Sequence, residues 1–583
     1  MSRDPAKKFT KQEKSWIMYD WANSVYATNI MAAIFPIYFT AVCKSAGVNG
    51  DEWWGYGTSI ATAVIAILAP LLGAVGDYKG LKKKLLAFFL FLGVGFTTVM
   101  AINDNWKMML VGYIISYIGF AGANLFYDSF LTDVTTEARM DRVSAWGYAM
   151  GYIGGSTIPF LISIGVLLVM GMDNPLAVKF SVIITSVWWL VFSIPILKNV
   201  KQVHYIEKAK GNAVANTFKN IGRTLSDIVK NKAIFFYMIA YFFYIDGVGT
   251  VIHMATTYGA TIGLDTVGMI LALLVTQLVA APFSVLFSKL AKKLGSLKMI
   301  CTAICIYVVI CSVGFYMGYS LEQKEIPFKA GYTAAVTEIK AGEPTFEDAA
   351  SKEIFDSVFV GDDINPGLYS ETDNMLASTE RVDTFNAAIA EITAADYEFG
   401  NVSDKLAFVQ YVGEYKDGVI AYIGDENNTK PYEDAIDFSS ALFWAMAVLV
   451  GTVQGGIQAL SRSYFGKLIP ANKSNEFFGF FDIFGKFASV IGPALYAFVR
   501  GYTGRPSLGI LSLIVLFFFG LITLFIGRKH FRNAEKIKED AGSSDTPEAL
   551  EEVTPAEADP AEEAAPAEAL EATPAEEATP AEE

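Results

Sequence analysis

One apolar stretch of the sequence carries a carboxyl group and an imidazole at helical spacing. Asp246, Thr250 and His253 lie within residues 242–255, "FFYIDGVGTVIHMA", and positions i, i+4 and i+7 share one face of an α-helix. A carboxyl and an imidazole in a shared aqueous cavity can exchange protons between about pH 5 and 8. We therefore expect Asp246 and His253 to bind a substrate or a proton. The alternative is that a neighbouring backbone group or Lys486 fixes Asp246 in place.

Other polar side chains also recur inside apolar stretches. A charge at the centre of a membrane costs roughly 3 kcal/mol on insertion scales, and lipid offers no hydrogen bond, so such groups must face other helices or a water-filled cavity. Hydrogen bonds between helices are the alternative to solute binding for the amides. The further candidates for contacts with a polar solute or ion are Asn23, Asn29, Asn124, Asp128, Gln454 and Gln458.

Charged residues near the ends of these stretches are candidates for a gate. Asp20 lies about one helical turn inside its stretch, where we expect it to join Asp128 or to pair with Arg139 or Arg142. Alternatively, Asp20 simply reaches water at the membrane surface. Arg462 is expected on the opposite side of the same inner gate. Its alternative role is to extend its long side chain to the interface.

A further pair of charges has a structural interpretation. Asp482 and Lys486 are spaced i and i+4, so we predict an ion pair within one helix. The chain has no P-loop, no GxSxG motif and no His/Cys cluster with metal-ligand spacing. We therefore predict that it is not an enzyme and needs neither metal nor cofactor, and that nucleic acid is not its partner. Without an ATP site, uphill transport must draw on an ion gradient.

The elements that must position these residues are membrane-spanning helices. Of the 583 residues, 53% are hydrophobic, and apolar runs of about 20 residues can each cross a hydrocarbon core of ~30 Å. We predict an all-α polytopic membrane protein with twelve spans. These spans are 16–42, 54–76, 85–102, 108–131, 144–170, 178–197, 233–258, 266–288, 298–319, 438–461, 477–499 and 506–527.

The distribution of basic residues predicts the orientation. With the N-terminus inside, the inner segments hold 31 Lys and Arg residues and the short outer loops five, as expected when basic loops stay in the cytoplasm. The linker 198–232 alone holds eight. We expect a multi-pass protein of a bacterial-type cytoplasmic membrane with both termini inside. We predict no removable signal peptide, so the first apolar span should be retained.

Two polar segments interrupt the pattern of spans. The insert 320–437 has 25 acidic and eight basic residues. We predict a small folded domain outside the membrane, with strands at "FVQYVGEY" (408–415) and "GVIAYIG" (418–424); a disordered acidic loop is the alternative. The tail 531–583 is rich in Pro, Ala and Glu and is predicted to be disordered and cytoplasmic.

The two halves of the membrane part resemble each other. Matching Gly151 to Gly485 also places Pro159 on Pro493, and matching Gly122 to Gly456 places Asp128 on Arg462. The predicted organisation is a six-helix bundle (1–197), the basic linker (198–232) and a second six-helix bundle (233–319 and 438–530). Spans 1, 4, 7 and 10 are the most polar, as a central aqueous cavity between two pseudo-symmetric bundles would require.

The segment "GDYKGLKKK" (76–84), between spans 2 and 3, resembles the signature of the major facilitator superfamily. The matching positions are Gly76, Asp77, Gly80, Lys82 and Lys83. The resemblance implies the twelve-helix facilitator fold and a conformational switch. In that switch the carboxylate binds helix ends or arginines in one state and releases them in the other. A solvated basic loop that only sets topology is the alternative.

Three further stretches are similar to the vacuole-effluxer-type family, which includes the autophagy-related exporter of vacuolar amino acids. They are "YDWANSVY", "FYIDGVGT" and "QALSRSYFGKLIP" followed by "EFFGFF". The resemblance implies a monomeric carrier in the lipid bilayer that moves a small polar, amino-acid-like solute, coupled to H⁺ or Na⁺. The alternative is a receptor or scaffold that has lost transport and whose insert binds an unidentified ligand.

Overall fold

The computed structural model describes residues 8–542, except 172–173, 208–212, 262–265, 341–343, 361–362, 365–381, 384, 387–388 and 390–398. Residues 531–542 of the predicted disordered tail are helical, so the prediction is wrong for that part, and residues 543–583 lie outside the described residues. So do the side chains of helix residues 213–220 and 486–489, and with them the side chain of Lys486. The chain divides into two compact units, Met1–Phe531 and Arg532–Glu583, and the account below concerns the first.

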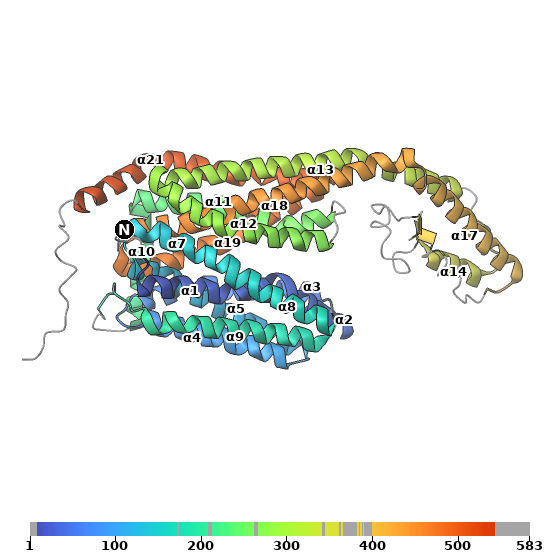
Figure 1. The fold of residues 1–583 in the computed structure, drawn as a ribbon. Helices are drawn as coiled ribbons and strands as arrows, with labels where there is room; N and C mark the ends of the chain where they lie inside the picture. Colours follow the sequence, from blue (N-terminus) through green and yellow to red (C-terminus); the bar gives the residue numbers. More distant parts are fainter. Residues whose placement is uncertain are drawn as a thin grey trace, which may run out of the picture. The chain divides into compact units, whose positions relative to one another are not determined.

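Twelve helical segments among the described residues are long and apolar enough to span a membrane, which confirms the predicted number. The first half consists of six such segments, drawn in blue to green in Figure 1. Several are built from more than one helix. Their elements are α1 (Lys11–Val25), η2 (Tyr26–Ala33) and α2 (Ile34–Ser45); α3 (Gly50–Gly76); α4 (Lys82–Ile102); α5 (Trp106–Ser129) and α6 (Leu131–Val134); α7 (Glu137–Met150), η3 (Gly151–Thr157) and α8 (Ile158–Met170); and α9 (Pro175–Asn199).

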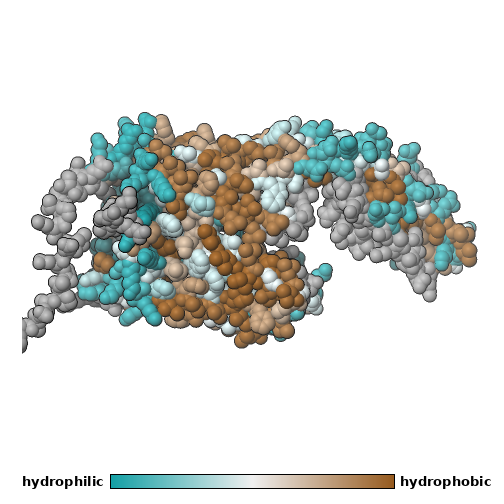
Figure 2. Space-filling model, viewed as in Figure 1, coloured by the Kyte–Doolittle hydropathy of each residue, from teal (hydrophilic) through white to brown (hydrophobic). Residues whose placement is uncertain are grey.

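The second half repeats this series after the linker helix α10 (Ala213–Lys230). Its apolar surface and that of the first half form the hydrophobic region in Figure 2, with hydrophilic residues gathered at the end that carries α10. We call this the linker end and the opposite one the insert end. The elements are α11 (Lys232–Thr261), α12 (Thr266–Leu294), α13 (Ser296–Lys340), α18 (Glu426–Leu468), η4 (Ala471–Lys473), α19 (Ser474–Thr503), α20 (Pro506–Ser512) and α21 (Ile514–Gly542).

Local sequence explains where several of these helices begin and end. Thr10 and Glu13 form a reciprocal capping box at the start of α1, which satisfies backbone N–H groups that have no partner within the helix. The side chain of Asn105 caps α5 in a simpler way. At the other end of a helix, Gly504 adopts φ of 69° just after α19, a left-handed conformation that glycine tolerates best.

Spans 1 and 5 each contain a π-helical segment, η2 and η3. Such wide turns are uncommon, and they often occur at functional sites. The segment η3 packs against α1 through glycines: a Cβ on Gly155 would lie 2.5 Å from Ser24 Cβ, and one on Gly154 would overlap the Trp21 ring. The glycine-rich run 150–156 is therefore a site of close helix packing.

The two halves meet mainly through four pairs of helices. α19 packs against α3, α12 and α18 pack against α7, and α12 also contacts η3. The α3–α19 crossing is close because Gly479 lies against the backbone of Ala69, where a Cβ would approach the carbonyl oxygen to 2.7 Å. Small residues allow helix backbones to approach in this way. Opening either end of the protein must therefore change these crossings.

The described part of the insert is mostly helical, and the prediction of strands at 408–415 and 418–424 is wrong. Apart from the capping residue Gly424, both stretches belong to one helix, α17 (Val402–Ile423), whose buried face includes Phe408, Tyr411, Val412, Tyr415 and Val419. These positions follow the 3.6-residue period of a helix. The insert also contains α14 (Ala349–Val358) and a short antiparallel pair, β1 (Phe359–Val360) and β2 (Asp363–Ile364). Both α13 and α18 run on from the membrane region into it (Figure 1).

Candidate functional site

Arg462 of α18 joins the two halves near the linker end. Its guanidinium donates to Asp128 Oδ1 at 2.9 Å, to Asp20 Oδ2 at 3.2 Å and to the side chain and carbonyl of Ser144 at 3.0 and 3.1 Å. Tyr127 donates its hydroxyl to the same Asp20 oxygen at 2.7 Å. Arg462, Asp20, Asp128, Ser144 and Tyr127 are called the arginine cluster below. The structure thus brings together three charged residues that the sequence analysis proposed for a gate.

Aromatic rings and a glycine shape the arginine cluster. The guanidinium lies over the rings of Tyr148, at 4.4 Å, and Trp16, at 4.7 Å, positions in which cation–π attraction is favourable. Arg462 is 3% exposed and Asp20 is 8% exposed. A Cβ on Gly147 would lie 2.4 Å from Asp20 Oδ2, so only glycine leaves room for the carboxylate. Charges so buried require this pairing, because an unpaired one would be strongly destabilising.

A second contact between the halves lies at Asp77, at the end of α3. Its carboxylate accepts hydrogen bonds from the backbone N–H of Asn475 at 2.9 Å, from the Asn475 side chain at 2.8 Å and from the backbone N–H of Glu476 at 3.0 Å. Asp77 therefore caps the N-terminus of α19 in the opposite half, where the helix dipole also favours a negative charge. This geometry matches what the facilitator resemblance implies for one conformational state.

The rest of the motif supports this cap. Lys82 is fully buried and pairs with Asp133 at 2.7 Å, and it donates to Ser474 Oγ at 2.9 Å. Gly80 has φ of 75°, and a Cβ on Gly76 would lie 2.6 Å from the Phe126 ring. Lys83 is only partly buried. Of the two lysines proposed for the switch, Lys82 makes the contact across the halves.

Burial affects the titration of Asp77. The carboxyl is 1% exposed, and loss of hydration raises its pKa to about 7, although Lys82 and the donors from Asn475 and Glu476 oppose the shift. Desolvation disfavours the charged form of an acid in this way. The cap can therefore gain or lose a proton near neutral pH.

A pseudo-symmetric counterpart of the Lys82 contact joins α7 to the second half. Asp141 accepts from Lys467 Nζ at 2.6 Å, from Ser463 Oγ at 2.6 Å and from Ser296 Oγ at 2.7 Å. The offset of 334 residues that separates Asp128 from Arg462 also separates Asp133 from Lys467. The sequence analysis missed this site. Extending the repeat alignment by five residues would have matched Asp133 with Lys467. An acidic residue of the first half would then have been seen to correspond to a basic residue of the second.

The linker holds the motif loop in place. Residues 200–207 run beside loop 76–81: Ile206 N donates to Asp77 O at 2.8 Å and Lys79 N donates to Ile206 O at 3.3 Å. Gln202 bridges the loop by accepting from Gly80 N at 2.9 Å and donating to Gly76 O at 3.1 Å. The linker is thus a structural part of this end of the protein as well as a basic segment.

Farther from the linker end, amides from both halves lie along the helices. Asn23 donates to Asn124 Oδ1 at 2.5 Å, and Tyr152 of η3 donates to Gln458 Oε1 of α18 at 3.3 Å. Tyr152 also lies beside the amide of Gln454. Asn124, Gln454 and Gln458 are partly exposed, so a solute between the halves can reach them.

Asn29 is placed differently from these amides. It is 1% exposed and lies in η2, where its amide nitrogen donates to Ser163 and Thr185 hydroxyls, both at 3.0 Å. Both partners belong to the first half. Its oxygen has no hydrogen-bond partner among the described residues. In this conformation Asn29 links helices within one half, which is the alternative that the sequence analysis left open for the amides.

Asp246 is 1% exposed, and neither carboxyl oxygen has a hydrogen-bond partner among the described residues. It faces α19 beside Thr250: a Cβ on Gly492 would lie 1.9 Å from Thr250 Oγ1 and 3.1 Å from Asp246 Oδ1. His253, farther along α11, is exposed. The structure therefore separates the environments of Asp246 and His253, although they share a helix.

The remaining predicted charges make other contacts. Arg142 lies over the Phe9 ring at 4.4 Å, and Arg139 pairs with Glu13 at 2.7 Å. Asp482 is partly buried, near enough to Asp128 for the two carboxylates to repel each other. Its predicted partner, the Lys486 side chain, lies outside the described residues. No group of three or more His, Cys, Asp and Glu residues that could hold a metal occurs in the described part of the chain.

Comparisons with known proteins agree with this architecture. The family model for vacuole effluxer Atg22-like proteins matches residues 54–334 and 438–536, which leaves out most of the insert. The MFS-type transporter YxiO of Bacillus subtilis is 36% identical over 528 residues, covering 89% of this chain and 95% of that protein. Autophagy-related protein 22-1 of Emericella nidulans is 35% identical over 71 residues, or 12% of each chain.

Among solved structures, an outward-facing bacterial homologue of the iron transporter ferroportin covers 90% of this chain and 98% of its own, with a TM-score of 0.49 and 9% identity. The family match covers most of the membrane part, including the motif loop and four members of the arginine cluster, Tyr127, Asp128, Ser144 and Arg462, while Asp20 lies before its first matched residue. The chain belongs to the vacuole effluxer Atg22-like family and is a transporter of the major facilitator type, not an enzyme.

Proposed function

We propose that the protein is a secondary transporter that moves a small polar solute of the amino-acid class by alternating access, with proton coupling and with the linker end in the cytoplasm. The orientation rests on the excess of Lys and Arg at the linker end. The substrate class rests on the family resemblance and on the partly exposed amides of Asn124, Gln454 and Gln458.

The observation that carries the proposal is the position of Arg462 between Asp20 and Asp128, at 3.2 and 2.9 Å. One buried cation of the second half holds two carboxylates of the first half. Asp77 adds a second contact between the halves at the same end. These contacts favour a state closed at the linker end, and they must break for that end to open. Alternating access requires such an element with two discrete arrangements.

Charge balance favours protons as the coupling ion. Asp20 and Asp128 carry one more charge than Arg462 neutralises when all three groups are ionised. Protonation of either carboxylate would weaken its hold on the guanidinium. Asp246 supplies a further site, since a buried carboxyl with no hydrogen-bond or ion-pair partner among the described residues is more stable when neutral. Release of its proton when water reaches α11 would link proton movement to the conformational change.

Transport in proteoliposomes tests this proposal. A mixture of labelled amino acids is offered with and without an imposed pH gradient, and accumulation above equilibrium is expected only with the gradient. Asp246→Asn should abolish gradient-driven accumulation and leave folding intact. Asp356→Asn is the matched control because Asp356 lies in the insert, with a side chain that is 58% exposed.

The outcomes separate the parts of the proposal. Wild-type accumulation by Asp246→Asn would remove Asp246 from coupling. Accumulation that follows a sodium gradient and ignores the pH gradient would exclude protons as the coupling ion. If no amino acid is transported but another polar solute is, the substrate class is wrong and the transport mechanism stands.

A further inference from the structure

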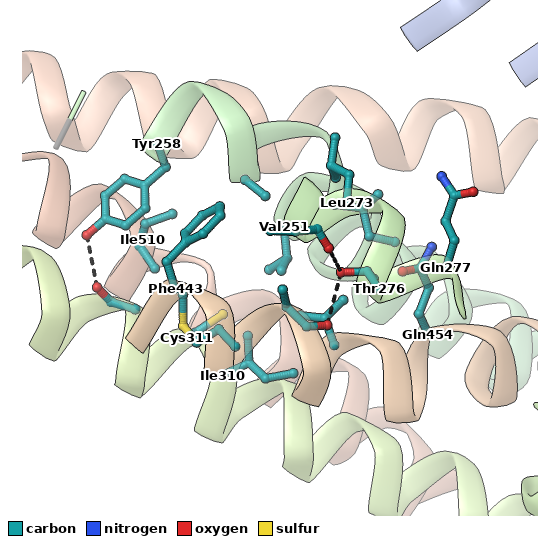
Figure 3. Close-up of a pocket in the computed structure, with 17 residues that line it drawn as sticks. Val251, Tyr258, Leu273, Thr276, Gln277, Ile310, Cys311, Phe443, Gln454 and Ile510 are labelled. Carbon is teal, nitrogen blue, oxygen red and sulfur yellow. Dashed lines mark hydrogen bonds between the residues drawn. The ribbon is translucent and has the colours of Figure 1, made fainter. Parts of the chain in front are cut away.

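The second half contains a partly open cavity of about 130 Å³. It is lined by residues of α11, α12, α13, α18 and α20, and its wall is largely apolar (Figure 3). Every residue that lines it belongs to the second half, whereas the arginine cluster lies between the halves. Representative wall residues are Val251, Leu273, Ile310, Phe443, Met446 and Ile510.

Two amides form the polar end of this cavity. Gln277 of α12 and Gln454 of α18 lie near each other there (Figure 3). Their amide oxygens are buried and have no hydrogen-bond partner among the described residues. Tyr152 lies beside Gln454, but its single O–H donates to Gln458. Buried acceptors that lack a donor cost free energy, and a ligand that supplies a donor removes this cost.

The other polar groups of the wall already have partners. The Thr276 hydroxyl lies 2.9 and 3.0 Å from the carbonyl oxygens of Ala272 and Ala447. The Tyr258 hydroxyl donates to Gly314 O at 2.9 Å. None of the 17 lining residues is charged. An ionised ligand would therefore lose its hydration without a counter-charge, which excludes a zwitterion or a carboxylate as a favourable occupant.

The volume of the cavity suits a small ligand. An apolar protein cavity of about 150 Å³ holds one benzene molecule, so about 130 Å³ suits a ligand of one aromatic ring. Phe443 and Met446 in the wall offer an aromatic ring and a thioether, both of which pack well against aromatic ligands. We propose that this cavity is a binding site for a neutral, single-ring aromatic molecule whose O–H or N–H group donates to Gln277 and Gln454.

The site adjoins the proposed transport route and shares Gln454 with it. Gln454 lies one helical turn from Gln458, which accepts the hydrogen bond from Tyr152 across the halves. A ligand bound to Gln454 would hold this part of α18 and α12 in the arrangement that the structure shows. The proposal does not depend on the identity of the transported solute or ion.

Cys311 provides a direct measurement because it lines the cavity and is buried. The full-length protein is prepared with its other three cysteines, Cys43, Cys301 and Cys305, replaced by serine. The rate of Cys311 modification by a small membrane-permeant thiol reagent is measured with phenol, toluene, benzylamine or benzoate present. Phenol should slow the reaction at concentrations about tenfold lower than toluene, because it supplies the hydrogen-bond donor. Benzylamine and benzoate should not protect Cys311 in their charged forms.

Two sets of variants test the site. Ala447→Leu fills the cavity and should abolish protection by phenol, whereas Ala445→Leu, at an exposed position of the same helix, should retain it. Gln277→Leu combined with Gln454→Leu should make phenol and toluene protect equally. Ligand-observed ¹⁹F NMR of 4-fluorophenol gives the same comparison without relying on thiol reactivity, and thermal unfolding checks that each variant is folded.

Each result decides the proposal. Protection by phenol that survives Ala447→Leu would overturn the site, as would equal potency of phenol and toluene in the protein with both glutamines. Protection by the charged ligands would overturn the assignment of a neutral ligand. If the protein does not transport solutes in proteoliposomes but phenol still protects Cys311, the proposed function fails and the binding site stands.

Discussion

Replacing Arg462 with methionine should open the linker end. The change removes the cation from two carboxylates that it contacts at 2.9 and 3.2 Å, of which Asp20 is 8% exposed. Leaving a buried charge without its partner typically costs about 3–5 kcal/mol. Water would hydrate the same carboxylates once the linker end opens, so this cost falls on the closed state. At about 1.4 kcal/mol per factor of ten, the closed-to-open ratio should fall by a factor of roughly 140 to 3,700.

Spin labels can measure this shift. Lys84, at the start of α4, and Lys298, at the start of α13, are exposed residues at the linker end of the two halves. The distance distribution between labels at these positions should gain a longer component in Arg462→Met.

The triple variant Asp20→Asn, Asp128→Asn, Arg462→Met is the control. It removes all three charges together, so no buried charge lacks a partner, and its distribution should return toward that of the wild type. A wild-type distribution in Arg462→Met itself, with the protein folded, would show that the arginine cluster does not stabilise closure.

Three further perturbations test other contacts. Burial raises the pKa of Asp77 to about 7 in the closed state, against an ordinary value of about 3.9. The closed state therefore binds the proton more tightly, and low pH favours closure. This contribution to closure is lost as the pH rises from about 4 to 7. Asp77→Asn should flatten that dependence of the label distance, and an unchanged profile would contradict the assignment. Gln202→Ala removes the three hydrogen bonds of its side chain to loop 76–81, at about 0.5–1.5 kcal/mol each. The loop amides should therefore exchange hydrogen faster, and equal exchange rates would count against the bridge. Gly492→Ala places a Cβ 1.9 Å from Thr250 Oγ1 and should lower the free energy of unfolding by about 1–3 kcal/mol, as measured by thermal unfolding. Adding Thr250→Ala should restore the stability. If it does not, the loss of stability has another cause.

Residue types and periodicity were sufficient to predict the spans but not the partners of their polar residues. The cost of unpaired polar groups in lipid indicates that Asp20, Asp128 and Arg462 must be paired, and the sequence analysis placed them at one gate. It offered Arg139 and Arg142 as alternatives because sequence does not show which of several cations a carboxylate meets. That choice depends on how helices from opposite halves rotate and cross. Asp20 and Arg462, for example, are 442 residues apart in the sequence.

The strands predicted in the insert show a different limit. In α17 the apolar residues alternate over a short range, which favours a strand, yet Phe408, Tyr411, Tyr415 and Val419 also fit a helical period. Counting over the full 22 residues of the helix resolves the ambiguity, because the helical period persists and the alternation does not. Asn29 illustrates the same limit for function, since the sequence cannot distinguish a residue that lines a route from one that joins two helices.

The continuity of α13 and α18 has a mechanical consequence for the insert. α13 has 45 residues and is about 67 Å long at 1.5 Å per residue, more than twice the ~30 Å of a hydrocarbon core. Just after Pro327 and Pro431, the rings of Phe328 and Tyr432 stack at 5.2 Å and tie the two helices together beyond the apolar region. If these paired helices tilt as one unit, a small rotation within the bilayer would produce a large displacement of the insert at their far end. An antibody fragment bound to the insert would then report the transport cycle from the insert end, without touching the transport pathway.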